Sequence, residues 1–343
     1  MKTAVVLFNL GGPDNPDAVR PFLTNLFSDP AIISLPGLLR WPLARLIAGR
    51  RTPVAKEIYA KIGGASPILP ETRAQAAALD AALDRRGHAA RSFIAMRYWK
   101  PFSAEAAKDI RAWGPDRVVL LPLYPQFSTT TTASSLSDWA RAAKAAGLDA
   151  PVSRVCCYPW NGGFIAAVTR LIREALAARK PGLDYRVLFS AHGLPERVVA
   201  GGDPYQWQVE KTAAAIVTEL GVPGLDHAVC YQSRVGPLKW IGPATDAEIR
   251  RAGQEAKGVI VVPIAFVSEH SETLVELDIE YAHLAREARV ADYRRVPTVA
   301  TAPEFIEGLA DLVEAALAGE EPATCGAGRI CPAERGRCGF EGA

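Results

Sequence analysis

Neither sign of charge is in excess in this chain of 343 residues, in which 39 Lys and Arg stand against 37 Asp and Glu. Proteins that bind nucleic acid usually carry a basic surplus on the binding face. A membrane-spanning helix needs about 18 consecutive apolar residues, and no run here approaches that length. These absences argue against nucleic acid as a partner and against a membrane span, and they favour a small-molecule site.

Targeting and nucleotide signatures are also missing. The stretch that begins at Met1 is a short apolar strand that Gly11-Gly12-Pro13 ends too early for a signal peptide. The chain has no G-x-G-x-x-G fingerprint and no Walker motif, and Pro13 removes a backbone donor where a phosphate would bind. We therefore expect a cytoplasmic protein without a nucleotide cofactor.

Cysteine is too sparse and too unevenly placed for a secreted disulfide framework. The six residues are Cys156, Cys157, Cys230, Cys325, Cys331 and Cys338. The last three lie on a Gly-rich tail and need a fourth ligand, which one of the adjacent pair can supply. Structural zinc is the alternative, but zinc sites favour C-x2-4-C spacing. The longer spacing here favours an iron–sulfur cluster.

Short apolar or β-branched runs alternate with longer amphipathic stretches, which is typical of an α/β protein. The length suits two lobes, which we place at residues 1–158 and 159–318, followed by a cysteine-bearing tail at 319–343. No fixed-period repeat is present, although the second lobe echoes the first. Strands are expected at residues 4–9, 90–96, 117–122, 152–156, 186–190, 227–231, 258–264 and 293–295.

One apolar strand leads directly into a helix start that carries His270 and Glu272. The carboxylates of Glu272, Glu276 and Glu280 recur at i, i+4 and i+8, where like charges repel by a few tenths of a kcal/mol per pair, roughly. Acids that complement a helix dipole are the alternative explanation, but it covers only Glu269 and Glu272. We infer that the row serves a function.

A second strand ends at His192, and Gly193 and Pro195 turn the chain directly afterwards. A lone histidine there would more often cap or fill a core. Two parallel strands that end side by side, however, could aim His192 and Glu272 at one point. An imidazole and a carboxylate so placed can hold a divalent ion or accept protons. Trp240, on a Gly- and Pro-bounded loop, either fills the core or forms a flat wall for a planar ligand.

Residues 30–52 are apolar with basic edges. Such a segment can line an apolar cleft or rest on a membrane surface, and a helix packed on the core is the alternative. Pro36, Gly37 and Pro42 disfavour a regular core helix.

Several motifs together resemble the ferrochelatase family over nearly the whole chain. They are Asn9-Leu-Gly-Gly-Pro13, Arg51-Thr-Pro53, Ile62-Gly-Gly-Ala-Ser-Pro67, Arg97-Tyr98, Tyr124-Pro-Gln-Phe-Ser128, Phe189-Ser-Ala-His-Gly-Leu-Pro195, Gln232-Ser-Arg-Val-Gly-Pro237 and Ser268-Glu-His-Ser-Glu-Thr-Leu274. The resemblance implies two similar Rossmann-like, doubly wound parallel-sheet lobes enclosing a porphyrin cleft. It also implies insertion of ferrous iron into protoporphyrin IX to give protohaem, with no nucleotide or redox cofactor.

The resemblance also implies residue roles. His192 corresponds to the family's site histidine, and Glu272 to a carboxylate that faces it across the macrocycle. Both are candidate ligands of the iron substrate. His270, a further candidate catalytic residue, and Glu269 form the polar pair beside them, while Glu269, Glu276 and Glu280 would form the path that passes protons or metal to solvent. The expected porphyrin contacts are Leu10, Leu23, Leu26, Ile32, Arg51, Tyr59, Ser66, Arg97, Tyr98 and Trp240.

Ferrochelatases that carry C-terminal cysteines hold a [2Fe-2S] cluster, which the resemblance implies here through Cys325, Cys331, Cys338 and one of Cys156 and Cys157. Ala166 occupies the position of the internal ligand of the animal enzymes. The cluster would be structural or a sensor. A chelatase for coproporphyrin III and a haem carrier or redox sensor without turnover are the competing functions. Peripheral membrane contact is expected at the apolar, basic-edged segment, and the sequence leaves a monomer and a homodimer equally open.

Overall fold

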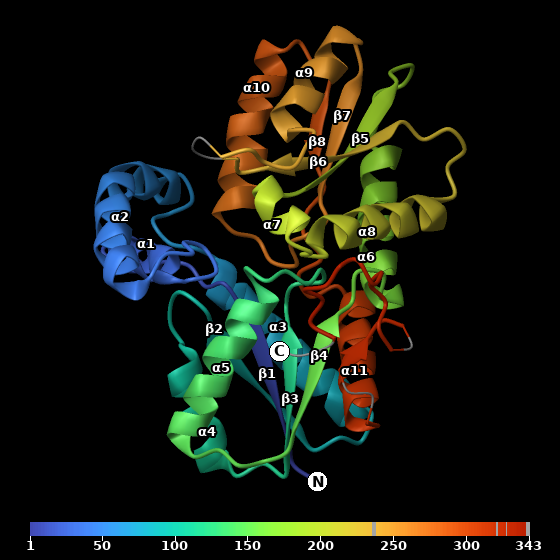
Figure 1. The fold of residues 1–343 in the computed structure, drawn as a ribbon. Helices are drawn as coiled ribbons and strands as arrows, with labels where there is room; N and C mark the ends of the chain where they lie inside the picture. The colour runs from blue at the N-terminus through green and yellow to red at the C-terminus, as the bar shows by residue number, and fades with distance from the viewer. Residues whose placement is uncertain (235–237, 320–321, 327, 341–343) are drawn as a thin grey trace. The chain divides into compact units, whose positions relative to one another are not determined.

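The computed structural model describes residues 1–234, 238–319, 322–326 and 328–340 (Figure 1). The chain forms two compact units, of which the first comprises Met1–Cys157, Leu309–Ile330 and Gly339–Ala343, and the second Tyr158–Gly308 and Cys331–Cys338. The division after Cys157 lies one residue from the lobe boundary expected from the sequence. The tail expected at 319–343 does not form a unit of its own here, because its residues are divided between the two units. Residues 320–321, 327 and 341–343 of that tail lie outside the described residues.

The first unit is built on a five-stranded parallel sheet in the order β2-β1-β3-β4-β9. Strand β1, between β2 and β3, is buried along its whole length, because apolar residues occupy both faces as a covered parallel sheet requires. The strands are β1 (Thr3–Asn9), β2 (Ala90–Met96), β3 (Arg117–Pro122), β4 (Val152–Cys157) and β9 (Ala323–Thr324). The strand order changes direction between β1 and β3, which is where doubly wound proteins bind ligands.

The second unit repeats this topology with four parallel strands in the order β6-β5-β7-β8. They are β5 (Tyr185–His192), β6 (His227–Gln232), β7 (Gly258–Pro263) and β8 (Tyr293–Arg295). The eight strands expected from the sequence are therefore confirmed, with ends that differ by at most two residues. The two-residue strand β9 was not foreseen, because so short a segment has no period of its own.

Helices connect the strands of both units (Figure 1). The first unit contains α1 (Val19–Ser28), α2 (Gly37–Ala60), α3 (Ile68–Arg85), α4 (Ser103–Trp113) and α5 (Thr132–Ala146). The helices that follow along the chain are α6 (Gly162–Ala177), α7 (Glu196–Ala200), α8 (Tyr205–Leu220), α9 (Thr245–Gln254), the π-helix η1 (Glu272–Glu280), α10 (Tyr281–Glu287) and α11 (Pro303–Leu317). No helix among the described residues has the length and hydropathy of a membrane span.

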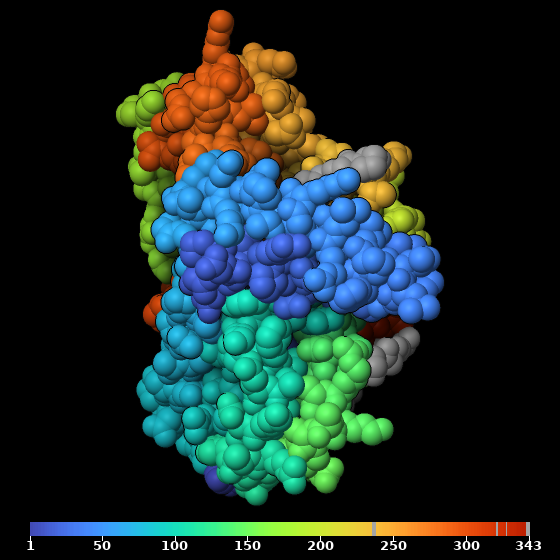
Figure 2. Space-filling model, turned by 90° about the vertical axis from the view of Figure 1, so that its left-hand side faces the viewer, coloured from blue at the N-terminus to red at the C-terminus, as the bar shows by residue number. Residues whose placement is uncertain are grey.

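Helix α2 corrects one expectation, because it runs without interruption through Pro42 and Pro53. Pro36 stands just before the helix, where a missing N–H costs nothing, and packing of α2 beside α1 offsets the two donors lost inside it. The helix is not a core helix, since the side chains of Leu38 and Trp41 are 93% and 57% exposed. Figure 2 shows the surface of α1 and α2 in blue on the face turned toward the viewer.

Candidate active site

The imidazole of His192 stands at the switch point of the second sheet. His192 is the last residue of β5, which lies between β6 and β7. Strand β7 ends at Pro263, and the loop that follows it leads to His270 and to Glu272 at the start of η1. The carboxyl ends of neighbouring parallel strands meet at one edge of the sheet. The fold therefore brings together side chains that are 80 residues apart in the sequence.

His192 and Glu272 are in direct contact, with Nδ1 of the imidazole 2.8 Å from Oε2 of the carboxylate. Nε2 of His270 lies 3.9 Å from the same oxygen. An aromatic ring needs roughly 3.5 Å on each of its faces, so no macrocycle fits between His192 and Glu272 here. The structure places the two groups in direct contact, whereas the resemblance implies that they face each other across the ring.

The charges of this pair are mutually stabilised. Burial disfavours the ionised carboxylate, but the positive potential of His192 and His270 outweighs it and lowers the pKa of Glu272 to about 2. Burial likewise disfavours the imidazolium, yet the facing Glu272 carboxylate raises the pKa of His192. An ionised carboxylate can only accept, so Nδ1 of His192 is the donor and Nε2 remains for a ligand. The His192 side chain is 39% exposed.

A second carboxylate, Glu276, is held beside the pair by polar groups from the end of β6. The Ser233 hydroxyl and N–H donate to it at 2.5 and 2.8 Å, and the Gln232 amide donates at 3.1 Å. Ser233 adopts a left-handed backbone conformation with φ 59°, which a non-glycine residue rarely adopts away from a functional constraint. Burial and the repulsion of Glu272 raise the pKa of Glu276.

The helix that carries these acids is a π-helix, which the spacing of the glutamates does not reveal. Segments of π-helix are uncommon and often occur at functional sites. Glu280, the third acid of the row, is exposed at the end of η1. The three acids thus run from a partly buried contact with His192 to the surface.

Glu269 is bound elsewhere than the sequence suggests. Its carboxylate accepts from Arg295 at 2.6 Å and from the N–H of Thr298 at 3.0 Å. Arg295 also bridges to Asp278 on η1 at 2.6 Å. Burial disfavours the Glu269 carboxylate, but the Arg295 charge outweighs it and lowers the pKa. The ion pairs therefore fix the loop that precedes His270 against the π-helix.

In the first unit, six of the expected porphyrin contacts pack in one apolar cluster between α1, α2 and the ends of β1 and β2. We call these six residues the lip cluster: Leu10, Leu23, Leu26, Ile32, Tyr59 and Tyr98. Ser66 is buried next to the loop after β1, where a Cβ added to Gly12 would lie 2.6 Å from its side chain. Arg51 is exposed on α2.

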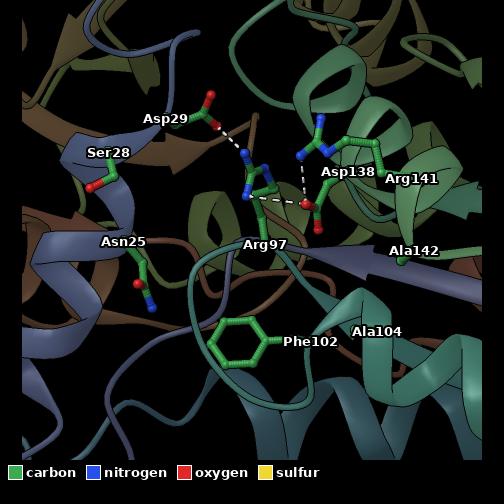
Figure 3. Close-up of a pocket in the computed structure, with 9 residues that line it drawn as sticks. All are labelled: Asn25, Ser28, Asp29, Arg97, Phe102, Ala104, Asp138, Arg141 and Ala142. Carbon is green, nitrogen blue, oxygen red and sulfur yellow. Dashed lines mark hydrogen bonds and ion pairs between the residues drawn. The ribbon is translucent and has the colours of Figure 1, made fainter. Parts of the chain in front are cut away.

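Arg97 lines a cavity of about 460 Å³ in the first unit. The guanidinium lies 2.8 Å from Asp29 and 3.8 Å from Asp138, and Arg141 pairs with Asp138 at 2.9 Å (Figure 3). Arg97 is therefore already balanced by carboxylates. Trp240, in the second unit, lies against Gly193 beside His192, and its buried indole N–H has no hydrogen-bond partner among the described residues.

Comparison with known proteins identifies the chemistry. The sequence model of the ferrochelatase family matches residues 2–317. A ferrochelatase of Caulobacter vibrioides is 58% identical over 341 residues, which cover 98% of this chain and 97% of that protein. The chain belongs to the ferrochelatase family. A ferrochelatase of Phenylobacterium zucineum is 56% identical over 340 residues, 98% of each chain.

Ferrochelatases insert ferrous iron into protoporphyrin to make haem, and this chain is an enzyme of that activity. The structure of the chelatase SirB from Bacillus subtilis with Fe3+ is similar to this one, with a TM-score of 0.52 and 13% sequence identity. The superposition covers 92% of this chain and 96% of the SirB chain. That likeness concerns the fold of two parallel-sheet lobes. Expected fold class and enzyme class are thus confirmed for this ferrochelatase.

Sequence reasoning missed the residues that hold the ferrochelatase site in place. Ser233, Gln232, Asp29 and Arg295 make their contacts to residues far away in the sequence, so no local pattern announces them. Ser233 and Gln232 do stand in a motif shared with the family, immediately after a strand. A polar residue directly after a strand of a doubly wound sheet is the one signal that could have found them.

The cysteines of this ferrochelatase provide the donor type that an iron–sulfur cluster requires. In the first unit, Cys156 and Cys157 are buried beside Phe127 and Ile330. In the second unit, buried Gln208 donates its amide N–H to the sulfur of Cys331 at 3.1 Å, the kind of bond that tunes cluster thiolates. Within the described residues, no three Cys, His, Asp or Glu side chains form a metal-holding group. The thiols fit a cluster in kind, and the described contacts do not assemble it.

Proposed function

We propose that His192 and Glu272 are the reacting pair of iron insertion. The carrying observation is the 2.8 Å contact between them, at the switch point of the second sheet. Insertion removes two protons from the pyrrole nitrogens. Since Nδ1 of His192 is bound to Glu272, the Nε2 nitrogen accepts a pyrrole proton, and Glu272 stabilises the imidazolium that forms. Glu272 contacts the incoming iron and accepts the second pyrrole proton, which passes on to Glu276.

Glu276 and Glu280 take part in proton and metal transfer between this pair and solvent. Their order along η1, from buried to exposed, supports this role. The raised pKa of Glu276 next to the lowered pKa of Glu272 gives a proton a downhill step from the inner to the outer carboxylate. His270, beside Glu272, completes the catalytic set. Glu269 supports it by fixing the loop before His270 through Arg295.

Porphyrin binds through the lip cluster with Arg51, Ser66, Arg97 and Trp240. The clustering of apolar residues around Tyr98 and Tyr59 supports an apolar floor for the ring. Exposed Arg51 on α2 supplies a cation for a propionate. Trp240 lies next to Gly193, and its buried indole N–H has no hydrogen-bond partner among the described residues. This placement supports a wall that faces the ring near His192.

The decisive experiment is anaerobic insertion of ferrous iron, followed by loss of porphyrin fluorescence. Protoporphyrin IX and coproporphyrin III are compared with the wild type, His192→Ala and the control His283→Ala, which alters an exposed histidine on α10. We expect insertion into protoporphyrin IX, a loss of at least about 100-fold in His192→Ala, and no change in the control. A faster reaction with coproporphyrin III would reassign the ring, and tight binding without turnover would indicate a carrier.

A [2Fe-2S] cluster is held by Cys325, Cys331, Cys338 and one of Cys156 and Cys157. The buried sulfur positions and the Gln208 bond to Cys331 support this. When bound, the cluster would supply structural support or redox sensing and no step of insertion, since the reaction transfers no electrons. Iron and sulfide analysis with the visible spectrum of the purified protein tests it. Comparison of Cys156→Ser with Cys157→Ser identifies the internal ligand, because only the variant that lacks the ligand should lose its colour. If both variants keep their colour, the assignment is wrong.

Helix α2 rests on an anionic membrane surface. Its exposed apolar side chains Leu38, Leu39, Trp41 and Leu46 stand among arginines, and Arg45 lies 4.7 Å from the Trp41 ring. Apolar burial combined with basic residues is the physical basis of interfacial binding. Co-sedimentation with vesicles containing phosphatidylserine tests this, with Leu38→Glu as the variant. Equal binding of the variant would contradict the proposal.

A further inference from the structure

Asp29 is a buried carboxylate at the start of the connector between α1 and α2. Its side chain is 2% exposed. Oδ1 accepts from the N–H of Ala31 at 2.8 Å, and the backbone carbonyl accepts from the N–H groups of Ile32 and Ile33 at 3.1 and 2.9 Å. Asp29 therefore fixes the turn that places Ile32, one member of the lip cluster.

The other oxygen of this carboxylate joins two further segments. Oδ2 accepts from the hydroxyl of Tyr98 at 2.9 Å, from the guanidinium of Arg97 at 2.8 Å and from the hydroxyl of Ser134 on α5. Ser134 in turn accepts from Nε of Arg97 at 2.7 Å. Figure 3 shows Arg97 between Asp29 and Asp138. One buried carboxylate thus ties the connector, the end of β2 and α5 together.

These bonds lie directly behind the lip cluster. Tyr98 packs in the cluster with its ring and reaches Asp29 with its hydroxyl. Burial, together with the Asp29 carboxylate, raises the pKa of Tyr98 well above its ordinary value, so the hydroxyl remains a donor at all working pH values. Ile32 and Leu26 enter the same cluster from the other side of Asp29.

We propose that Asp29 is a positioning residue for porphyrin, which holds the connector and Tyr98 so that the lip cluster is preformed for the ring. This inference rests on the proposed role of the lip cluster. Asp29 itself contacts no substrate in this account. A preformed surface avoids the ordering cost of binding, so loss of Asp29 should weaken porphyrin binding and leave the chemistry of His192 and Glu272 intact.

Asp138 provides a matched control in the same cavity. It accepts from Ser103 at 2.8 Å and pairs with Arg141, but lies 3.8 Å from Arg97. It makes no bond to the connector or to Tyr98 in the described contacts. Removing either charge changes the cavity by one carboxylate, whereas only Asp29 supports the lip cluster.

The experiment measures the KM for protoporphyrin IX, kcat and the Kd from quenching of protein fluorescence, in Asp29→Asn and Asp138→Asn. We expect Asp29→Asn to raise KM and Kd at least about 10-fold, since a buried hydrogen bond to a charged group is lost, with kcat within about threefold. Asp138→Asn should leave all three unchanged. Unchanged KM and Kd in Asp29→Asn, or an equal effect of both variants, overturns the proposal.

Ser134→Ala is the second variant, because Asp29→Asn removes a buried charge and can impair folding. It deletes only the hydroxyl that bridges Asp29 and Arg97, and a smaller rise in KM, about threefold, is expected. No rise in a folded Ser134→Ala protein argues against the role of this network. Ile32→Ala distinguishes failure of the lip cluster as a porphyrin site from failure of Asp29 as its positioning residue. If it leaves KM unchanged as well, the lip cluster does not bind porphyrin. If it raises KM while Asp29→Asn does not, only the role of Asp29 fails.

Discussion

Replacing Glu272 by Gln should lower the pKa of His192, and the structure sets the size of the effect. The pKa of Glu272 is lowered from 4.5 to about 2 against the opposing effect of burial. That difference corresponds to roughly 3 kcal/mol at 1.36 kcal/mol per pKa unit. The His192 and Glu272 side chains are 39% and 27% exposed, so solvent screening reduces the coupling to about 1–2 kcal/mol.

The direction of the effect follows from linkage. Glu272 raises the pKa of His192, so the imidazolium is favoured in the folded protein and its contribution to stability is lost as pH rises through that pKa. The lowered pKa of Glu272 contributes stability that is present above about 4.5 and lost as pH falls toward about 2. In Glu272→Gln burial and the weaker opposing effect of the Glu276 carboxylate still act on His192, and its pKa should fall by about one unit or more.

Selective isotope labelling of histidine makes this measurable, because the chain has only five histidines. The ring resonance of His192, assigned through His192→Gln, is titrated in the wild type and in Glu272→Gln. Glu287→Gln, which breaks an exposed pair with His283, is the control and should leave the His192 titration unchanged. An unchanged His192 pKa in Glu272→Gln would show that the pair does not form in solution, and the mechanism would lose the carboxylate that stabilises the imidazolium.

Three further substitutions test the supporting structure. Arg295→Met leaves the buried Glu269 carboxylate without its cation and should destabilise the protein by about 3 kcal/mol in urea unfolding, whereas a loss below about 1 kcal/mol would mean that solvent already reaches the pair. Gly12→Ala places a Cβ 2.6 Å from the side chain of Ser66 and should cost about 1–3 kcal/mol, seen as a lower melting temperature, and an unchanged melting temperature would contradict this contact. Ser233→Gly keeps the φ of 59° without strain and should hold stability while kcat falls about 10-fold, and an unchanged kcat would exclude the hydroxyl from the site.

The sequence predicts the strands well because burial on both faces leaves a strong local signal. β1 and β7 are buried along their whole length and mostly apolar, and each is followed by turn-forming residues. The sequence also indicates that His192 and Glu272 lie close together, and they do, because each belongs to a segment at the carboxyl end of a buried strand. Pro42 misleads because its local cost is offset by packing against α1, which no local pattern reports.

The π-helix and the positioning residues lie beyond local reasoning for another reason. Glutamates at i, i+4 and i+8 share a face in an α-helix and nearly so in a π-helix, so the spacing of Glu272 and Glu276 does not distinguish them. An α-helix and a π-helix differ in the register of their backbone hydrogen bonds, which the spacing of side chains does not report. Ser233 and Asp29 become visible only when the chain has folded, because each binds groups more than 40 residues away.

The two units share one strand order and use its carboxyl ends differently. After β1 and β2, Asn9 donates to Thr72 and Arg97 donates to Asp29 within the unit. After β5 the imidazole of His192 keeps one nitrogen available beside an ionised Glu272. A strand end whose polar groups are all paired can shape an apolar surface but cannot exchange protons. If the proposed roles hold, the same topology serves binding in the first unit and proton transfer in the second, so substitutions in the lip cluster should change KM while those of His192 and Glu272 change kcat.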